Sequence, residues 1–468
     1  MMIRSQFIIA ALVLTVAGTV YSQASRPNAE SRTFELTPTA PPTPALKYQL
    51  HFNFADSHPG NAASVYMQAI MFLGAETDKT AQKALDAYAA KDFKTFEALA
   101  DSLKLPTMYE ELEVAGRRER CDWDPPVRQR GEGTLLPHLE PLAHGVSRAI
   151  QTRALRQIQQ GKLSDALGTL RLGYELGDNV GTEPILVSSL VSIAITTRMN
   201  EALVELMNHA DSPNLYWALS EFPARRPILR RSWDHEAWWI FYCIPTLQKV
   251  RAGQELSAEQ WRTALIDETL PFYSIAENYV TVRYRPHPDP ISGANPPTVK
   301  NSQQFYAQTH QITPEQAAKI DPAIVLGNFY YHEYEVASDE VAKLRGLPYP
   351  MMLTKTREVS LDLDRLRREQ PSNPFIELVA PLHNAVLSVA RADRQIAALT
   401  AVEAVRSYAA ANGGKLPDRL DDVTDTPVPV NPLTGKPFDY KVDNDIATAT
   451  LSDPSSEAPL TYTIRIRK

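Results

Sequence analysis

The residues of this chain best suited to chemistry are two carboxylates set among tryptophans. The run from Trp233 to Trp239 reads WDHEAWW. Asp234 and Glu236 supply the acid and base types that glycoside hydrolysis needs, and the indoles could line a sugar cleft. Neighbouring residues of a helix point apart, however, so each carboxylate would need a partner from elsewhere in the chain. We favour a packed aromatic core here and keep Asp234 and Glu236 as the alternative catalytic residues.

Two further segments hold metal-binding residue types without the spacing of a metal site. His332-Glu333-Tyr334-Glu335 has no second histidine four residues after the first, so one helical face cannot present two imidazoles. The aspartates at positions 418, 421, 422 and 425 lack the ordered spacing of a calcium loop. We interpret both as solvated surface and expect no metal, no cofactor and no catalytic residues elsewhere.

Composition and charge exclude one class of partner. The chain has 468 residues, of which 44% are apolar and 22% are charged, a balance typical of globular proteins. Its formal charge is −7 and its pI is near 5.9. Because neutralising phosphates requires a basic surface, we expect no nucleic-acid partner.

The first residues are typical of an export signal. Met1-Met2-Ile3-Arg4 is short and positive, an apolar run extends from Phe7 to Val20, and Ser22-Gln23-Ala24 offers small residues for cleavage. The apolar run is shorter than the ~20 residues that span a bilayer. We therefore expect residues 1–24 to be removed, leaving an exported, periplasmic or extracellular chain with no permanent membrane span. An uncleaved anchor is the alternative.

Cysteine content leaves two alternatives open. Cys121 and Cys243 are the two cysteines of the chain, and an even pair in an exported protein permits one disulfide. Two buried thiols fit the sequence equally well, because sequence gives no distance between them.

Proline and apolar periodicity divide the rest of the chain. Four prolines between Thr37 and Pro44 favour an extended linker, so we assign residues 25–45 to a Pro-rich linker and expect folding to begin near Ala45. Apolar periodicity then predicts helices over residues 62–74, 81–90, 92–103 and 135–160. We assign residues 46–375 to a helical-hairpin domain. The proline-rich interval from Arg283 to Gln303 is predicted to be an exposed loop.

One hairpin has a recognisable pattern. Gly161, Leu163, Ala166 and Leu170 follow the spacing by which the turn of a tetratricopeptide repeat packs its second helix on its first, and Ala154 occupies the small position of the first helix. Stacked repeats need neighbours to bury their faces. A single matching unit therefore predicts either degenerate repeats around it or a plain helical hairpin.

Several segments together resemble a known family. They look like those of uncharacterised exported helical proteins of planctomycete bacteria, and the similarity covers roughly Ala45 to Pro223. The resemblance implies export and helical repeats, and it implies no activity. The segments are Pro59-Gly60-Asn61-Ala62-Ala63, Arg117-Arg118-Glu119-Arg120-Cys121-Asp122-Trp123, Leu136-Pro137-His138-Leu139 and Pro213-Asn214-Leu215-Tyr216-Trp217-Ala218-Leu219.

The last part of the chain predicts a separate module. A helix with an apolar face through Ala398, Val402 and Val405 precedes alternating apolar residues near Tyr440 and Tyr462. We assign residues 376–468 to a helix packed on a small antiparallel sheet. The order from Ala404 to Val442 resembles the soluble end of type II secretion pseudopilins, but the pilin processing motif and its long apolar helix do not precede it.

These observations predict a mainly α protein of stacked helical hairpins, an irregular TPR-like solenoid or bundle, with the C-terminal helix-and-sheet module. We expect a non-enzymatic role in protein–protein interaction or cell-envelope architecture, with envelope or exported proteins as partners. The alternative is an envelope hydrolase that acts on glycan or peptide through Asp234 and Glu236.

Overall fold

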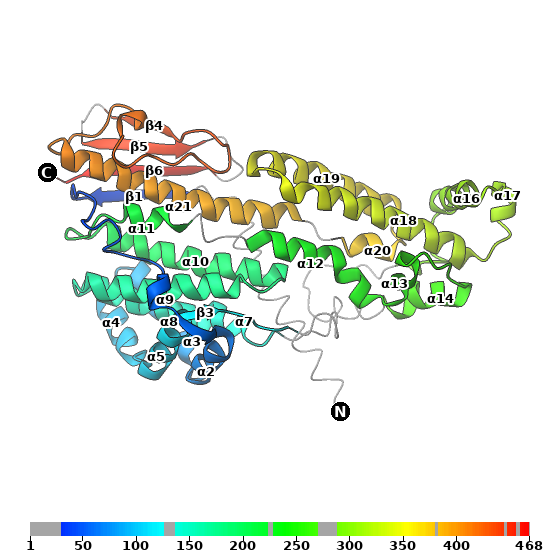
Figure 1. Cartoon of the computed structure of the whole chain (residues 1–468), viewed down its shortest axis with the longest axis horizontal. Helices are drawn as coiled ribbons and strands as arrows, with labels where there is room; N and C mark the ends of the chain where they lie inside the picture. Colours follow the sequence, from blue (N-terminus) through cyan, green and yellow to red (C-terminus); the bar gives the residue numbers. More distant parts are fainter. Residues whose placement is uncertain are drawn as a thin grey trace.

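A computed structural model describes most of the chain. The described residues are 30–125, 136–222, 228–269, 288–379, 382–443, 447–454 and 459–467, with the side chains of residues 228–231 left aside. Residues 1–29 lie outside this set, so the predicted signal segment stays a prediction. The architecture is mainly helical, as expected, with a four-stranded mixed sheet and a separate pair of short strands (Figure 1).

The first part of the chain folds into antiparallel helices. Its helices are α2 (Ala62–Met71), α3 (Thr77–Ala89), α4 (Phe93–Ser102), α5 (Pro106–Gly116), α7 (Leu139–Pro141), the π-helix η3 (Leu142–Val146), α8 (Ser147–Gln159), α9 (Leu163–Val180), α10 (Leu186–Met207) and α11 (Tyr216–Ser220). A 3-10 turn, η1 (Phe54–Asp56), and two short parallel strands, β2 (His58–Asn61) and β3 (Arg118–Arg120), complete it. The helix expected over residues 135–160 is therefore three successive elements.

The predicted turn at Gly161 is confirmed, and an equivalent turn precedes it. The Gly161 amide donates to the Ile158 carbonyl at 3.0 Å and the Lys162 amide donates to Gln157 at 2.9 Å. Lys91, the last turn residue between α3 and α4, has a φ of 59° and the same pair of hydrogen bonds, because its amide donates to Tyr88 and the Asp92 amide donates to Ala87. The hairpin α3–α4 packs against α8 of the hairpin α8–α9.

The second part contains shorter helices followed by three long ones. They are α12 (Ile228–Cys243), α13 (Thr246–Arg251), α14 (Ala258–Arg262), the π-helix η5 (Thr263–Asp267), α16 (Pro296–His310), α17 (Pro314–Ala317), α18 (Pro322–Lys343), η6 (Leu344–Gly346), α19 (Tyr349–Glu369), α20 (Pro374–Glu377), α21 (Leu382–Ala411) and η7 (Leu420–Asp422). In Figure 1, α13 to α18 extend away from the sheet toward the right-hand end.

Proline begins helix α16, where a loop was predicted. Asn295 caps the helix by accepting from the Thr298 amide at 2.8 Å, and Pro296 follows at a position that needs no amide donor. The prediction of a loop from Arg283 to Gln303 is therefore wrong over residues 296–303. Residues 283–287 lie outside the described residues.

The sheet contains an N-terminal strand that the sequence analysis placed in a linker. Strands β4 (Asp439–Val442), β5 (Thr448–Asp453) and β6 (Leu460–Ile466) are antiparallel, as predicted. Strand β1 (Glu30–Leu36) pairs with β6 in parallel, so that the sheet order is β1-β6-β5-β4 (Figure 1). The assignment of residues 25–45 to a linker is wrong over residues 30–36, and the described fold begins at Glu30 instead of Ala45.

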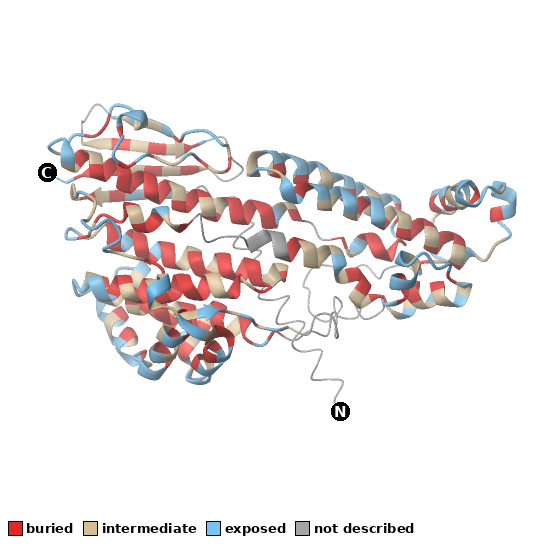
Figure 2. Cartoon of the chain, viewed as in Figure 1, coloured by how far each residue is buried: buried red, intermediate tan, exposed pale blue. Residues whose placement is uncertain are grey.

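The strand β1 joins the sheet because its apolar residues alternate. Phe34 and Leu36 are fully buried, and Glu35 between them faces outward. Both belong to one core that also contains Met199 of α10, Val402 of α21 and Ile464 of β6. The sheet and the first helical part therefore share a single core, and Figure 2 shows α21 buried along most of its length.

Close packing fixes α9 against α10. A Cβ atom added at Gly173 would collide with the side chain of Met199, and one added at Gly177 would lie 3.0 Å from the Thr196 hydroxyl. Both glycines therefore let the two helix backbones approach each other. A second core, around Trp261, Tyr330 and Phe375, holds α12 to α20 together.

Ala166 provides a test of the hairpin. This side chain is fully buried, whereas Ser164 in the same first turn of α9 is exposed. Ala166→Arg should lower the free energy of unfolding by about 3 kcal/mol or more, because it forces a long charged side chain into a filled core. Ser164→Arg should change it by less than about 0.5 kcal/mol. Chemical denaturation of the two variants measures the difference, and equal stability of Ala166→Arg and the parent would contradict the hairpin packing.

Candidate functional site

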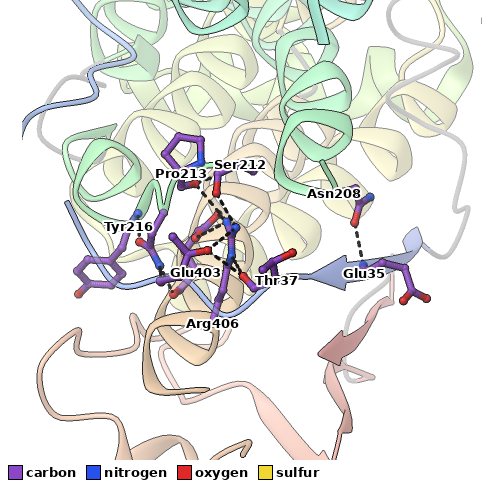
Figure 3. A network of polar contacts seen from close by, with 10 residues as sticks. Glu35, Thr37, Asn208, Ser212, Pro213, Tyr216, Glu403 and Arg406 are labelled. Carbon is purple, nitrogen blue, oxygen red and sulfur yellow. Dashed lines mark hydrogen bonds and ion pairs between the residues drawn. The ribbon is translucent and has the colours of Figure 1, made fainter. Parts of the chain in front are cut away.

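A buried ion pair on α21 holds three distant segments together. Glu403 and Arg406 are both fully buried, and their carboxylate and guanidinium lie 3.3 Å apart. Arg406 also donates to residues 37–39, which precede the first helical part, and to the turn between α10 and α11, as Figure 3 shows. Its acceptors are the carbonyls of Thr37 at 2.7 Å, Ser212 at 2.7 Å and Pro213 at 3.1 Å, and the hydroxyl of Thr39 at 3.0 Å.

Asn214 and Glu403 complete this cluster, which we call the Arg406 network. The Asn214 amide group donates to the carbonyls of Thr39 and Glu403, each at 3.1 Å. Burial raises the pKa of the Glu403 carboxyl above its usual value, and the Arg406 charge opposes that rise. The network therefore fixes residues 37–39 and the turn after α10 against α21.

A second polar chain links β1 to the helices. Glu30 accepts hydrogen bonds from Tyr462 at 2.7 Å and from Gln395 at 3.0 Å. Gln395 in turn accepts from Asn200 at 2.7 Å, and Asn200 accepts from the hydroxyl of Tyr174 at 2.9 Å. The first residue of β1 is thus connected through α21 and α10 to α9.

These elements enclose a groove that we take as the candidate functional site. It has a volume of about 910 Å³ and is lined by α3, α8, α10, α21 and β1. We call it the α10 groove, because α10 lines it from Leu190 to Glu205. The described residues that carry charge on its wall are Glu30, Arg32, Lys91, Arg148, Arg198, Glu201, Glu205, Arg391 and Arg394.

One half of the α10 groove is basic. Arg198 donates to the Ala143 carbonyl at 2.6 Å and to the Ser147 hydroxyl at 2.5 Å, and in the described part of the chain no carboxylate lies within ion-pair distance of it. Burial, and then repulsion from Arg148, lowers the pKa of Arg198 to about 10. The Arg198 guanidinium is therefore positioned in the groove wall by hydrogen bonds to uncharged groups.

The other half of the groove carries carboxylates that also have neutral partners. Glu201 accepts from Gln151 at 2.9 Å, and Glu205 accepts from the hydroxyl of Tyr88 at 3.2 Å. Neither carboxylate makes an ion pair with another residue that the structure describes. Glu201 attracts Arg198 and Arg32 at longer range. Because charged groups without a direct ion pair can gain from a charged ligand, this wall is suited to recognition.

A second hollow, about 940 Å³, lies between α4, α5, α8 and α9. Three of its charged residues, Lys104, Glu113 and Arg156, form ion pairs within the protein. Arg156 contacts Glu97 at 2.6 Å and Asp101 at 3.0 Å, and Lys104 contacts Asp101 at 3.1 Å. This pairing leaves less for a ligand to neutralise than the α10 groove does.

The sequence analysis missed the α10 groove residues, although α10 carries a signal. Arg198, Glu201 and Glu205 lie at i, i+3 and i+7 in an otherwise apolar and small-residue helix. That spacing places three charges on one face. The opposite face of the helix is apolar, and its Met199 and Leu203 are fully buried.

The structure does not join Asp234 and Glu236 in a cleft. Both lie on α12, but Asp234 forms an ion pair with Arg345, and Glu236 faces a cavity of only about 20 Å³ beside Trp233. Trp233 is buried, whereas Trp238 is 45% exposed and lies under the Arg251 guanidinium. The prediction of a packed aromatic core therefore holds for Trp233. It is wrong for Trp238, which lies at the surface.

The other segments with metal-binding residue types form ordinary contacts. His332 stacks on Phe305 with ring centroids 4.5 Å apart, Glu333 accepts from Gln370, and Asp421 pairs with Arg419. Within the described ranges there is no group of three or more His, Cys, Asp or Glu residues suited to a metal ion. Cys121 and Cys243 are not joined by a disulfide.

Three of the segments that carry the family resemblance meet in space. Asn61 and Asp122 exchange two hydrogen bonds of 2.8 Å, Trp123 stacks on His138 at 4.2 Å, and His138 contacts the buried Glu183 at 3.3 Å. Ser188 donates to the same oxygen of Glu183. Serine and histidine therefore bind one carboxylate oxygen instead of each other, which is not the contact of a nucleophile with its base.

Comparison with known proteins assigns no family. No family model matches the chain, and no significant match was found among curated proteins or solved structures. Among the helices of the described residues, none is both long and apolar enough to cross a membrane. Function is therefore inferred from the residues of the α10 groove.

Removing the charge of Arg406 tests the network that positions β1 and α21. Arg406→Met should lower the free energy of unfolding by about 3–5 kcal/mol, because it leaves the buried Glu403 unpaired. Without Arg406 the pKa of Glu403 in the folded state rises further above its unfolded value. The deficit should therefore be larger at about pH 7 than at about pH 5, where protonation removes the unpaired charge.

The double variant Glu403→Gln with Arg406→Met serves as the control. It should recover part of the lost stability and lose most of the pH dependence. Denaturant unfolding of the three proteins at both pH values measures this. A single variant with the same deficit at both pH values would contradict the unpaired-carboxylate explanation.

Proposed function

We propose that this chain is an exported, non-enzymatic binding protein, and that the α10 groove receives a polypeptide segment of an envelope or exported partner. The observation that carries the proposal is the charged wall of the groove. Arg198, Glu201 and Glu205 have neutral hydrogen-bond partners and no direct ion pair among the described residues, so a charged ligand can pair with them.

The construction of the groove supports binding of a defined ligand. Its walls come from helices and a strand that share one packed core, and rigid elements hold recognition groups better than loops do. Its volume of about 910 Å³ lies within the range of established ligand sites, roughly 300–1,000 Å³. An elongated groove along a helix also suits an extended peptide.

The paired hairpins support a repeat-like role. The turns at Lys91 and Gly161 share one hydrogen-bond pattern, and α3 of the first hairpin packs on α8 of the second. Stacked hairpins of the TPR-like kind commonly present concave surfaces to protein partners. We therefore regard α3–α4 as a degenerate neighbour of the α8–α9 unit.

Export remains part of the proposal and is supported by the sequence from Met1 to Ala24. A hydrolase acting through Asp234 and Glu236 has less support, because Asp234 is engaged with Arg345 and the cavity at Glu236 is too small for a sugar ring.

Site-specific photocrosslinking in native cells tests the proposal. Gln82 lines the α10 groove from α3, whereas the next residue, Lys83, is exposed and is not part of the lining. A photoreactive residue at position 82 should form a discrete adduct with an envelope or exported protein, because the ligand passes within a few ångströms of it. The same residue at position 83 should give at least about fivefold less of that adduct.

Mass spectrometry of the adduct identifies the partner. Equal adducts at positions 82 and 83 would contradict the use of the groove, as would the absence of any adduct at position 82. Turnover of an envelope glycan or peptide by the purified chain, abolished by Asp234→Asn or Glu236→Gln, would replace the binding function with the hydrolase.

A further inference from the structure

We infer that the α10 groove recognises an extended peptide carrying an acidic and a basic side chain about three residues apart. This inference rests on the proposed function and adds the chemistry of the ligand. The groove has a direction, because Arg198 lies at one position along α10 and Glu201 and Glu205 follow it on the same face.

The basic half is reinforced by neighbouring residues. Arg148 lines the groove near Arg198, and their mutual repulsion contributes to the lowered pKa of Arg198. Asp78 forms an ion pair with Arg148 at 2.5 Å, whereas Arg198 has no direct ion pair among the described residues and is attracted by Glu201 and Asp78 only from farther away. A ligand carboxylate would supply the missing counter-charge, and a bidentate contact suits a guanidinium.

The acidic half calls for the opposite charge. Glu201 and Glu205 are one turn apart, both side chains are exposed to the groove, and their described hydrogen-bond partners are Gln151 and Tyr88. A ligand ammonium or guanidinium would pair with Glu205 and would also be attracted by Glu201. A polyanion would be attracted by the basic residues of the groove but repelled by these two carboxylates, whereas a peptide with both charges can satisfy the two kinds of group.

The spacing follows from the two backbones. Arg198 and Glu205 are separated by seven helical residues, which is about 10 Å along the axis of α10. An extended peptide advances about 3.3 Å per residue. Charges about three residues apart in the ligand therefore match the charges of the wall.

Fluorescence anisotropy with designed peptides tests the inference. The probe is a labelled peptide, Gly-Gly-Glu-Ala-Ala-Lys-Gly-Gly, and its control replaces glutamate by glutamine and lysine by norleucine. The full chain should bind the probe at least about tenfold more tightly than the control at low salt. Arg198→Gln keeps a donor for the Ala143 carbonyl and should weaken probe binding about three- to tenfold.

A charge swap separates recognition from damage to the fold. Glu205 is exposed, so Glu205→Lys should leave the fold intact. The parent should bind the probe more tightly than a peptide in which the lysine of the probe is replaced by glutamate. The Glu205→Lys variant should bind that second peptide more tightly than the probe. Glu110→Lys, on α5 in the second hollow, is the matched control and should keep the order of the parent.

The outcomes distinguish the inference from the function on which it rests. Reversal by Glu205→Lys, with loss in Arg198→Gln, supports the inference. The inference is overturned if a partner crosslinks at position 82 but the probe does not bind, or binds equally well to the parent and to both variants. In that case the proposed binding function remains. No adduct at position 82 removes the proposed function itself.

Discussion

The structure depends on a guanidinium that has been taken out of water. Arg406 is fully buried, and a buried charge is tolerated only where a counter-charge and hydrogen-bond acceptors replace the solvent. Glu403 supplies the counter-charge, and the acceptors come from residues 37–39 and from the turn after α10. These segments must therefore meet at α21. The pair need not stabilise the fold more than apolar residues would, but it specifies which segments come together.

The α10 groove is a consequence of this arrangement. Once residues 37–39 are held at α21, β1 lies beside β6, and Glu30 reaches Gln395 of α21 and the wall of the groove. Helix α10 then lies between α21 on one side and the α8–α9 hairpin on the other. The groove is thus formed by β1, by helices α3, α8 and α10 of the first part, and by α21 near the end of the described chain. No single hairpin forms it.

The sequence was informative where structure is local. The turn at Gly161, the burial of Ala166 and the alternating strands near Tyr462 follow from patterns within a few residues, and the structure confirms them. Strand β1 was missed because it is short and precedes a proline-rich segment, and because its partner β6 is more than 400 residues away in the chain. A pattern within a few residues cannot predict the pairing of two strands that are so far apart in the sequence.

The same limit applies to the candidate site. Asp234 and Glu236 attracted interest through their residue types, yet the decisive fact about Asp234 is an ion pair with Arg345, a residue from a remote turn. The spacing of Arg198 and Glu205 is visible in the sequence, but their lack of a direct ion pair among the described residues is a property of the folded chain. The charged residues on the otherwise largely apolar helix α10 were the feature of the sequence that indicated this site.

Strand β1 is an integral part of the sheet and, through it, of the groove. Amide hydrogen exchange of the full chain tests this directly. The hydrogen-bonded amides of β1 should exchange as slowly as those of β6, because parallel pairing holds β1 on β6 and the Arg406 network holds the residues after β1 on α21. Exchange of β1 at the rate of an unfolded chain, with β5 and β6 still protected, would contradict it.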